Sequence, residues 1–185
     1  GETVNEWDTC STGAYSVVRV WMLGKDYGLS LDPRDPFSFC HTELEKYHRA
    51  CYTEFAGNLD FLSDWDVTRL QELTAEVPKE YRADTVRIAV AVMFQRDVLR
   101  EDLSSYLTGC RALPAGLREA CLRGVIFGLV SHGAPGKEEV RALTYCQAPE
   151  LTKDEKDICF EELLVDLENH APSKVKDLRF KIYGS

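Results

Sequence analysis

The sequence lacks a long apolar run and lacks an excess of basic residues. Its longest apolar stretch, VRIAVAVMF over 86–94, is less than half of the roughly 20 residues that a membrane-spanning helix needs. We therefore expect a core helix there and no membrane insertion. The 31 acidic residues outnumber the 22 basic ones and leave a net charge of −9. This charge repels phosphate backbones, which argues against nucleic-acid binding.

Common catalytic and cofactor motifs are missing as well. The chain contains no phosphate loop, no dinucleotide-binding glycine pattern, no nucleophile elbow and no C-x2-C knuckle. We expect no cofactor, and an enzyme is the less favoured class. No segment alternates convincingly as a β-strand, so the periodicity favours an all-α fold.

A repeated cysteine spacing is present instead. Two cysteines stand eleven positions apart in CHTELEKYHRAC (40–51) and in CRALPAGLREAC (110–121), and CQAPELTKDEKDIC (146–159) is the same unit with two residues inserted. A fourth copy, TAEVPKEYRADT (74–85), has threonine at both positions. Because both cysteines are replaced together, the spacing predicts bonded pairs. The starts at 40, 74, 110 and 146 give intervals of 34, 36 and 36 residues, typical of helix-turn-helix solenoids such as the tetratricopeptide type.

The repeat predicts an all-α, short solenoid of about four stacked helical hairpins of 34–38 residues, stapled by disulfides, as one domain over 1–185. Its expected parts are a half unit at 1–31, units at about 32–64, 65–97, 98–133 and 134–170, and a cap or truncated unit at 171–185. We expect short first helices at 65–73, 98–109 and 137–145, and long helices at 12–23, 43–62, 79–95, 115–131 and 153–169. In LSDWDV (62–67) we expect Asp64 to cap a helix N-terminus.

Two further regularities surround the second cysteine or threonine of each copy, at positions 51, 85, 121 and 159, here called the second staple position. Apolar residues stand one, four and eight positions after it, which predicts one buried stripe per helix: Tyr52, Phe55, Leu59, Val86, Ala89, Met93, Leu122, Val125, Leu129, Phe160, Leu163 and Leu167. Three positions before it the residue is basic, namely His48, Arg82, Arg118 or Lys156. Such a cation would reach across to a neighbouring helix end.

The predicted disulfides are Cys40–Cys51, Cys110–Cys121 and Cys146–Cys159, each contributing on the order of 3 kcal/mol. Buried free thiols and metal ligation are the alternatives. Disulfides imply an oxidising compartment, so we expect a secreted, periplasmic or extracellular surface location. Cys10 is left over. It is either a free, intermolecular thiol or a residue whose partner precedes the sequence in a longer protein.

The chain resembles the disulfide-paired helical-hairpin repeats of exported bacterial proteins with no assigned function, because its C-x10-C pattern has the tail ACYTEF (50–55) or ACLRGV (120–125). The resemblance covers 40–170 and implies export and a helical-repeat fold. The threonine pair and the insertion in the last unit depart from the family pattern. No chemistry is transferred by this resemblance.

One polar cluster is a candidate metal site. His41, Glu45 and His48 would share a helix face, with Glu45-x-x-His48 similar to half of a di-iron site. Because such sites need two copies, a polar surface face is the favoured interpretation.

The short first helices are the expected partner-binding face, because one set of helices lines the concave side of a solenoid. Trp, Tyr and Arg supply most interface hot spots, so the candidate contacts are Trp65, Arg69, Tyr106, Arg141 and Tyr145. The sequence therefore favours a non-catalytic, exported module that binds a protein partner. The alternatives are a metal-binding or enzymatic domain using the His/Glu cluster, and a structural spacer of a larger surface protein.

Overall fold

Helices supply the regular secondary structure of this protein. The computed structural model describes residues 6–96, 103–133 and 136–183. Within these ranges there is no β-strand, only an isolated bridge between Asp32 and Asp35, so the expected all-α class is confirmed. The chain divides into two compact units, 1–89 and 90–185, with the boundary inside α6 (Lys79–Arg96). The single repeat domain over 1–185 stays a prediction.

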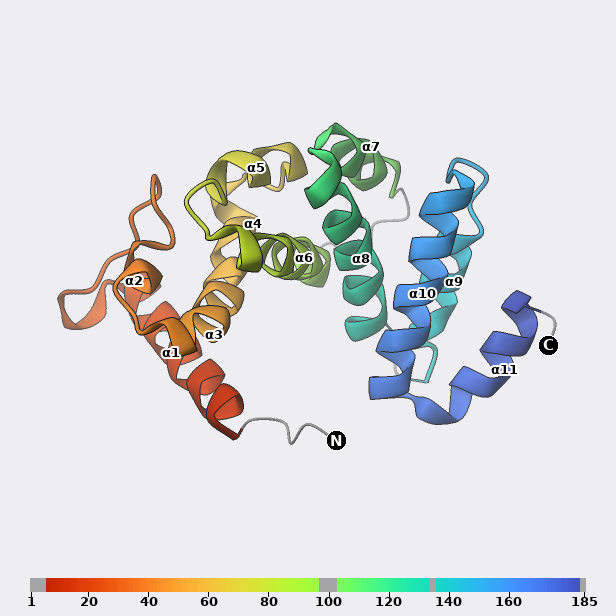
Figure 1. Cartoon of the computed structure of the whole chain (residues 1–185), viewed down its shortest axis with the longest axis horizontal. Helices are drawn as coiled ribbons and strands as arrows, with labels where there is room; N and C mark the ends of the chain where they lie inside the picture. Colours follow the sequence, from red (N-terminus) through yellow and green to blue (C-terminus); the bar gives the residue numbers. More distant parts are fainter. Residues whose placement is uncertain (1–5, 97–102, 134–135, 184–185) are drawn as a thin grey trace. The chain divides into compact units, whose positions relative to one another are not determined.

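Unit 1 contains helices of very different length (Figure 1). They are α1 (Glu6–Gly24), η1 (Asp26–Gly28), α2 (Ser38–His41), α3 (Glu45–Phe55), η2 (Ala56–Asn58), α4 (Leu59–Leu62), η3 (Val67–Arg69), α5 (Leu70–Leu73) and the first half of α6. Helices α1 and α3 pack against each other. The core is aromatic: the Phe39 and Phe55 rings stack at 5.7 Å, and those of Tyr52 and Tyr81 at 5.6 Å.

Two helices expected in unit 1 are interrupted. The predicted helix 43–62 is broken by the 3-10 turn η2, where the Arg19 side chain lies so close to Gly57 that a Cβ there would meet Nη1 at 2.6 Å. The predicted helix 65–73 starts only at Val67, because Asp64 and Trp65 adopt left-handed φ values of 53° and 64°. Asp64 as the helix cap is therefore wrong. Asp66 takes that role, and its carboxylate accepts from the Thr68 backbone N–H at 2.9 Å.

Unit 2 is built around two long helices that lie side by side in Figure 1, α8 (Ala115–Ser131) and α10 (Lys153–His170). Helices α7 (Ser104–Ala112) and α9 (Glu138–Cys146) pack on α8, and α11 (Pro172–Tyr183) packs on α10. Residues 98–102 of the predicted helix 98–109 lie outside the described ranges, and the described helix continues to Ala112. The tail expected as a cap or truncated unit contains α11.

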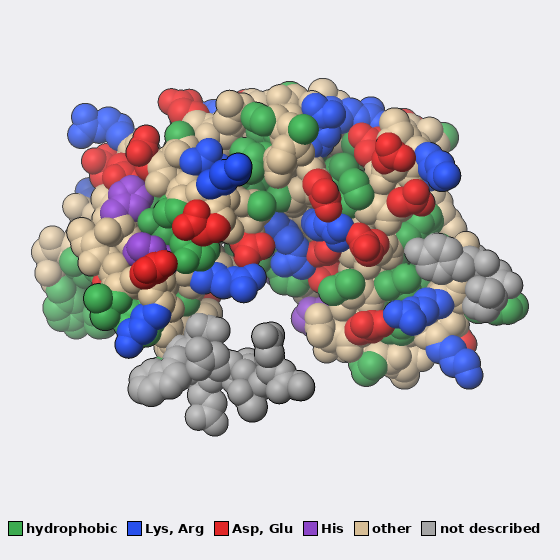
Figure 2. All heavy atoms as spheres, viewed as in Figure 1, with side chains coloured by type: hydrophobic (Ala, Val, Ile, Leu, Met, Phe, Trp, Pro, Cys, Tyr) green, Lys and Arg blue, Asp and Glu red, His purple; other side chains and the backbone are tan. Residues whose placement is uncertain are grey.

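Two kinds of contact connect the helices of unit 2: a close approach of α6 to α8, and ion pairs between α8 and α10. A Cβ on Gly128 of α8 would lie 2.7 Å from the Phe94 Cβ, so only glycine allows this contact. Arg123 on α8 pairs with Glu161 at 2.5 Å and with the buried Glu162 at 3.0 Å, both on α10. Figure 2 shows Lys and Arg side chains interspersed with Asp and Glu over the visible face of this unit.

Three disulfides join short helices to long ones. Cys40–Cys51 links α2 to α3, Cys110–Cys121 links α7 to α8, and Cys146–Cys159 links α9 to α10. The expected disulfide bonding is confirmed, and it is typical of proteins in an oxidising environment. Cys10 on α1 is exposed and is the free cysteine of the described chain. Of the twelve residues in the predicted apolar stripes all are buried except Phe160, which is half-buried.

In the first three copies, the basic residue three positions before the second cysteine or threonine contacts the adjacent turn. The His48 ring donates to the Glu43 carbonyl at 3.0 Å, and Arg118 donates to the Leu113 carbonyl at 3.4 Å. In both cases the acceptor lies five residues earlier, at the turn after the shorter helix. Arg82 makes the same contact with the Val77 carbonyl at 2.8 Å and also reaches the Ala75 carbonyl at 2.6 Å. These side chains donate to backbone carbonyls of the turn that joins the two helices of a hairpin.

Candidate functional site

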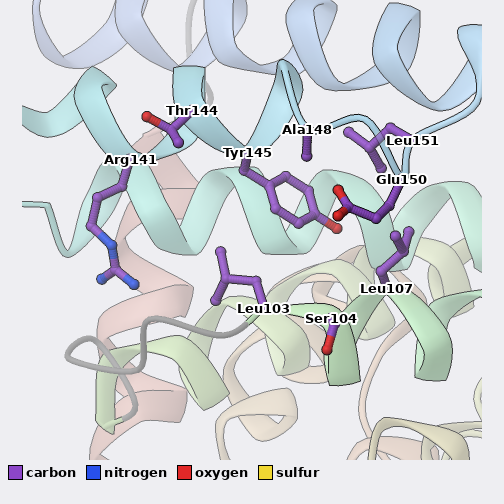
Figure 3. A pocket seen from close by; sticks show the side chains of 9 residues that line it. All are labelled: Leu103, Ser104, Leu107, Arg141, Thr144, Tyr145, Ala148, Glu150 and Leu151. Carbon is purple, nitrogen blue, oxygen red and sulfur yellow. The ribbon is translucent and has the colours of Figure 1, made fainter.

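A mainly apolar pocket of about 380 Å³ opens in unit 2 between α7, α9 and the loop that leads to α10. Figure 3 shows the side chains around it. Its lining comes from Leu103, Ser104, Leu107, Arg141, Thr144, Tyr145, Ala148, Glu150 and Leu151. This volume lies at the small end of the range of about 300–1,000 Å³ found for ligand pockets.

Tyr145 is the central polar group of the pocket. Its side chain extends from α9 across the pocket, with the hydroxyl on the side of Leu107 and Glu150 (Figure 3). Tyr145 is only 7% exposed, and its hydroxyl has no hydrogen-bond partner among the described residues. Burial raises the pKa of Tyr145, and the negative charge of Glu155 raises it further. The hydroxyl therefore stays protonated at physiological pH and is a buried donor without an acceptor.

One wall of the pocket is fixed by an ion pair. Arg111 at the end of α7 binds Glu155 of α10 through two hydrogen bonds, of 2.8 and 2.6 Å, and also donates to the Glu150 carbonyl at 2.7 Å. Glu155 completes a capping box with Thr152, the N-cap of α10. Hydrogen bonding to Arg111 lowers the pKa of Glu155 to about 2. This network holds the loop 147–152 against α7.

Arg141 and Glu150 give the pocket two charged ends. In Figure 3 they lie on opposite sides of the Tyr145 ring, with Arg141 directed away from the hydroxyl. Arg141 is half-buried and Glu150 is exposed at the surface. A ligand that fills the pocket would thus meet a cation at one end, a carboxylate at the other and an apolar floor between them.

Two of the five predicted partner contacts lie together in this pocket. Arg141 and Tyr145 both line the pocket, whereas Tyr106 is buried against Phe94, with ring centroids 4.2 Å apart. Trp65 is half-buried and Arg69 is exposed, and both belong to unit 1. Sequence reasoning missed the leucines of the wall and Glu150, because apolar residues on short helices carry no signal that separates a pocket wall from a core.

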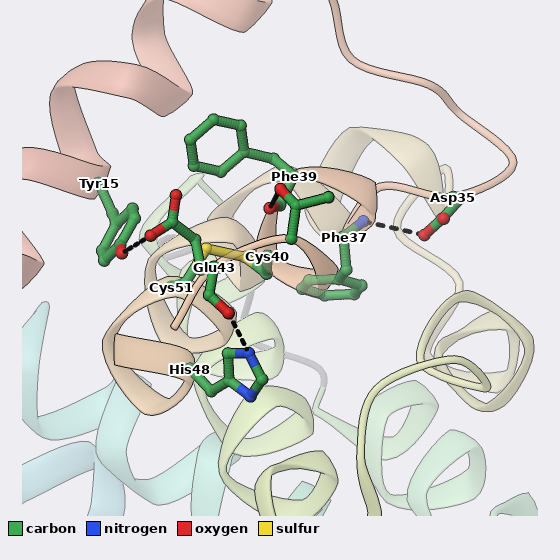
Figure 4. Close-up of a disulfide and its surroundings, with 9 residues drawn as sticks. Tyr15, Asp35, Phe37, Phe39, Cys40, Glu43, His48 and Cys51 are labelled. Atoms are coloured by element: carbon green, nitrogen blue, oxygen red, sulfur yellow. Dashed lines mark hydrogen bonds between the residues drawn. A yellow bond between two sulfur atoms is a disulfide. The ribbon is translucent and has the colours of Figure 1, made fainter. Parts of the chain in front are cut away.

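A turn separates the candidate metal residue His41 from the other two, Glu45 and His48, so the three do not share one helix. His41 ends α2 and its Nδ1 lies 3.6 Å from an Asp35 carboxylate oxygen, whereas Glu45 begins α3. The His48 Nε2 donates a hydrogen bond to the Glu43 carbonyl, close to the Cys40–Cys51 disulfide (Figure 4). Among the residues that the structure describes, no group of three or more His, Cys, Asp or Glu side chains is arranged to hold a metal ion.

Comparisons of the chain with protein-family models, curated proteins and solved structures give no match. In the described ranges, no helix has both the length and the apolar character needed to cross a membrane.

Proposed function

We propose that this chain is an exported, non-enzymatic helical-repeat module that binds a protein partner through residues of its short first helices. Export is supported by the three disulfides, which persist in oxidising compartments, and by the resemblance to exported hairpin-repeat proteins.

The repeat itself is supported by hairpins that recur along the chain. In three places a shorter helix is tied to a longer one by a disulfide, with Cα atoms 5.4 to 5.7 Å apart. The contact between a basic side chain and the carbonyl five residues before it recurs in the first three copies, including the copy with threonines. Units that share such local devices stack readily into a solenoid.

The pocket carries the binding proposal. Two of the five residues chosen from sequence as partner contacts, Arg141 and Tyr145, line it together, and both stand on a short first helix, α9. A concave apolar site with a few polar groups is the usual form of a binding site. Arginine and tyrosine are also the residue types that most often anchor interfaces.

Chemical crosslinking followed by purification of the partner tests the proposal. The protein is mixed with the extracellular and envelope proteins of its source, crosslinked, and each candidate is purified and titrated by calorimetry. We expect at least one purified protein to bind, and Arg141→Glu or Arg69→Glu to weaken it by roughly tenfold or more. Arg34→Glu, an exposed charge reversal in the loop between η1 and α2, is the control. If no purified protein binds, or if neither variant weakens binding, the proposal fails.

A further inference from the structure

The buried hydroxyl of Tyr145 determines what kind of acceptor the pocket can take. A buried donor without a partner costs roughly 1–3 kcal/mol, which an occupant offering an acceptor would recover. The acceptor should be neutral, because Glu150 lines the same side of the pocket and the Glu155 carboxylate acts on the hydroxyl more strongly than its ion-pair partner Arg111 does. A carboxylate placed there would be repelled by both, whereas a main-chain carbonyl would not.

The apolar walls of the pocket indicate which kind of side chain it can accept. Leu103, Leu107 and Leu151 join the Tyr145 ring in a surface that is mostly apolar. A volume of about 380 Å³ accepts one bulky side chain together with part of its backbone. Burying such a side chain supplies the hydrophobic part of the binding free energy.

Arg141, at the other end of the pocket, indicates that the occupant carries an anionic group beside its apolar side chain. Arg141 stands one helical turn before Tyr145 on α9, and its side chain leads away from the hydroxyl (Figure 3). An anion on the occupant therefore meets Arg141 at a different point from the one where a carbonyl meets Tyr145. A peptide offers these two groups separately, while a fatty acid has only one polar end.

We propose that the α7–α9 pocket binds a segment of a protein partner in which a large apolar residue is next to an aspartate or glutamate. The apolar side chain packs on the three leucines, a main-chain carbonyl accepts from Tyr145, and the acidic side chain faces Arg141. This inference rests on the proposed function as a protein-binding module and names the chemistry of the partner segment.

A random peptide library panned against the intact, oxidised protein tests the inference. We expect the enriched peptides to share a bulky apolar residue flanked by Asp or Glu. Tyr145→Phe, which keeps the ring, should weaken these peptides by about 2- to 10-fold, the effect of one hydrogen bond. Panning against Arg141→Glu should change the flanking preference from acidic to Lys or Arg. Tyr27→Phe, at an exposed tyrosine of unit 1, is the matched control and should change nothing.

Two variants that fill the pocket test whether the peptides bind there, so that the test still stands if one variant misfolds. Leu103→Arg and Thr144→Arg each place a long side chain at the pocket, from a half-buried and an exposed position, and should reduce peptide affinity more than tenfold. Melting curves establish that each variant is folded.

Three outcomes would overturn the inference. Enriched peptides that bind folded Leu103→Arg and Thr144→Arg undiminished bind elsewhere, which would leave the proposed function intact. Direct binding of decanoate that displaces the peptides and is lost in the same variants would make the site one for free amphiphiles. If neither the library nor the crosslinked extract yields a polypeptide that binds, the inference and the proposed function fail together.

Discussion

Replacing Thr74 and Thr85 together by cysteine would build a fourth disulfide if the repeat register is right. Both threonines are completely buried, and each hydroxyl donates to the carbonyl four residues earlier, that of Leu70 at 2.7 Å and that of Tyr81 at 2.9 Å. They occupy the positions held by cysteines in the 40–51 and 110–121 copies, where Cα atoms lie 5.7 and 5.5 Å apart over the same separation of eleven residues. Such distances suit a disulfide.

The expected gain follows from loop closure. Closing a loop of this length restricts the unfolded chain by about 3 kcal/mol at 25 °C. Against this stand the two hydroxyl hydrogen bonds, worth together about 1 kcal/mol, because both acceptors are carbonyls that helices can satisfy through the backbone. The net stabilisation of about 2 kcal/mol corresponds to a rise in Tm of about 4–8 °C for a chain of this size.

The assay compares oxidised and reduced protein in a Cys10→Ser background, which removes the exposed free thiol. Thiol labelling and intact mass report whether Thr74→Cys and Thr85→Cys have bonded, and thermal unfolding with and without reductant reports the gain. Each single substitution serves as a control that cannot form the bond. If the double variant keeps both thiols free while the three native disulfides form, the two positions do not face each other and the repeat does not extend through 74–85.

Three further outcomes are expected. Tyr145→Phe should leave the free energy of unfolding unchanged or raise it by up to about 1 kcal/mol, whereas Tyr15→Phe, equally buried but bonded to a carboxylate at 2.9 Å, should lower it by about 1–2 kcal/mol in chemical denaturation. Because the pKa of Glu155 is lowered to about 2, its contribution should be complete above its ordinary value of 4.5 and be lost as the pH falls from there towards 2, as titration of the unfolding free energy would show. Arg82→Ala should destabilise the protein more than Arg118→Ala, because Arg82 makes three hydrogen bonds to carbonyls and Arg118 makes one. Equal losses for the two tyrosines, a flat acid profile, or equal losses for the two arginines would contradict these expectations in turn.

Local and periodic features of the fold could be predicted from the sequence. The disulfide bonds and the buried stripes depend on spacing along one hairpin, which the sequence displays directly. The broken helix at Gly57 could not be predicted, since it accompanies the approach of Arg19 from another helix. The shift of the helix cap from Asp64 to Asp66 depends on two residues with left-handed φ, a backbone choice that composition does not reveal.

The candidate site was predictable only in part, for a related reason. Tyr145 and Arg141 could be selected because aromatic and cationic residues on a short helix are unusual enough to notice. The leucines beside them could not, because a pocket forms where the packing of α7, α9 and the following loop leaves a space. That space depends on the ion pair between Arg111 and Glu155, whose partners lie 44 residues apart in the chain.

The copy without a disulfide shows how the hairpins hold their turns. Each turn has backbone carbonyls that need hydrogen-bond donors and must also keep two helix ends close together. In the 40–51 and 110–121 copies the disulfide holds the helix ends together, and His48 or Arg118 makes one contact with the turn. Where threonines replace the cysteines, Arg82 binds the carbonyls of both Ala75 and Val77. Among these three copies, the basic residue therefore makes its most extensive contacts with the turn where the covalent link is missing.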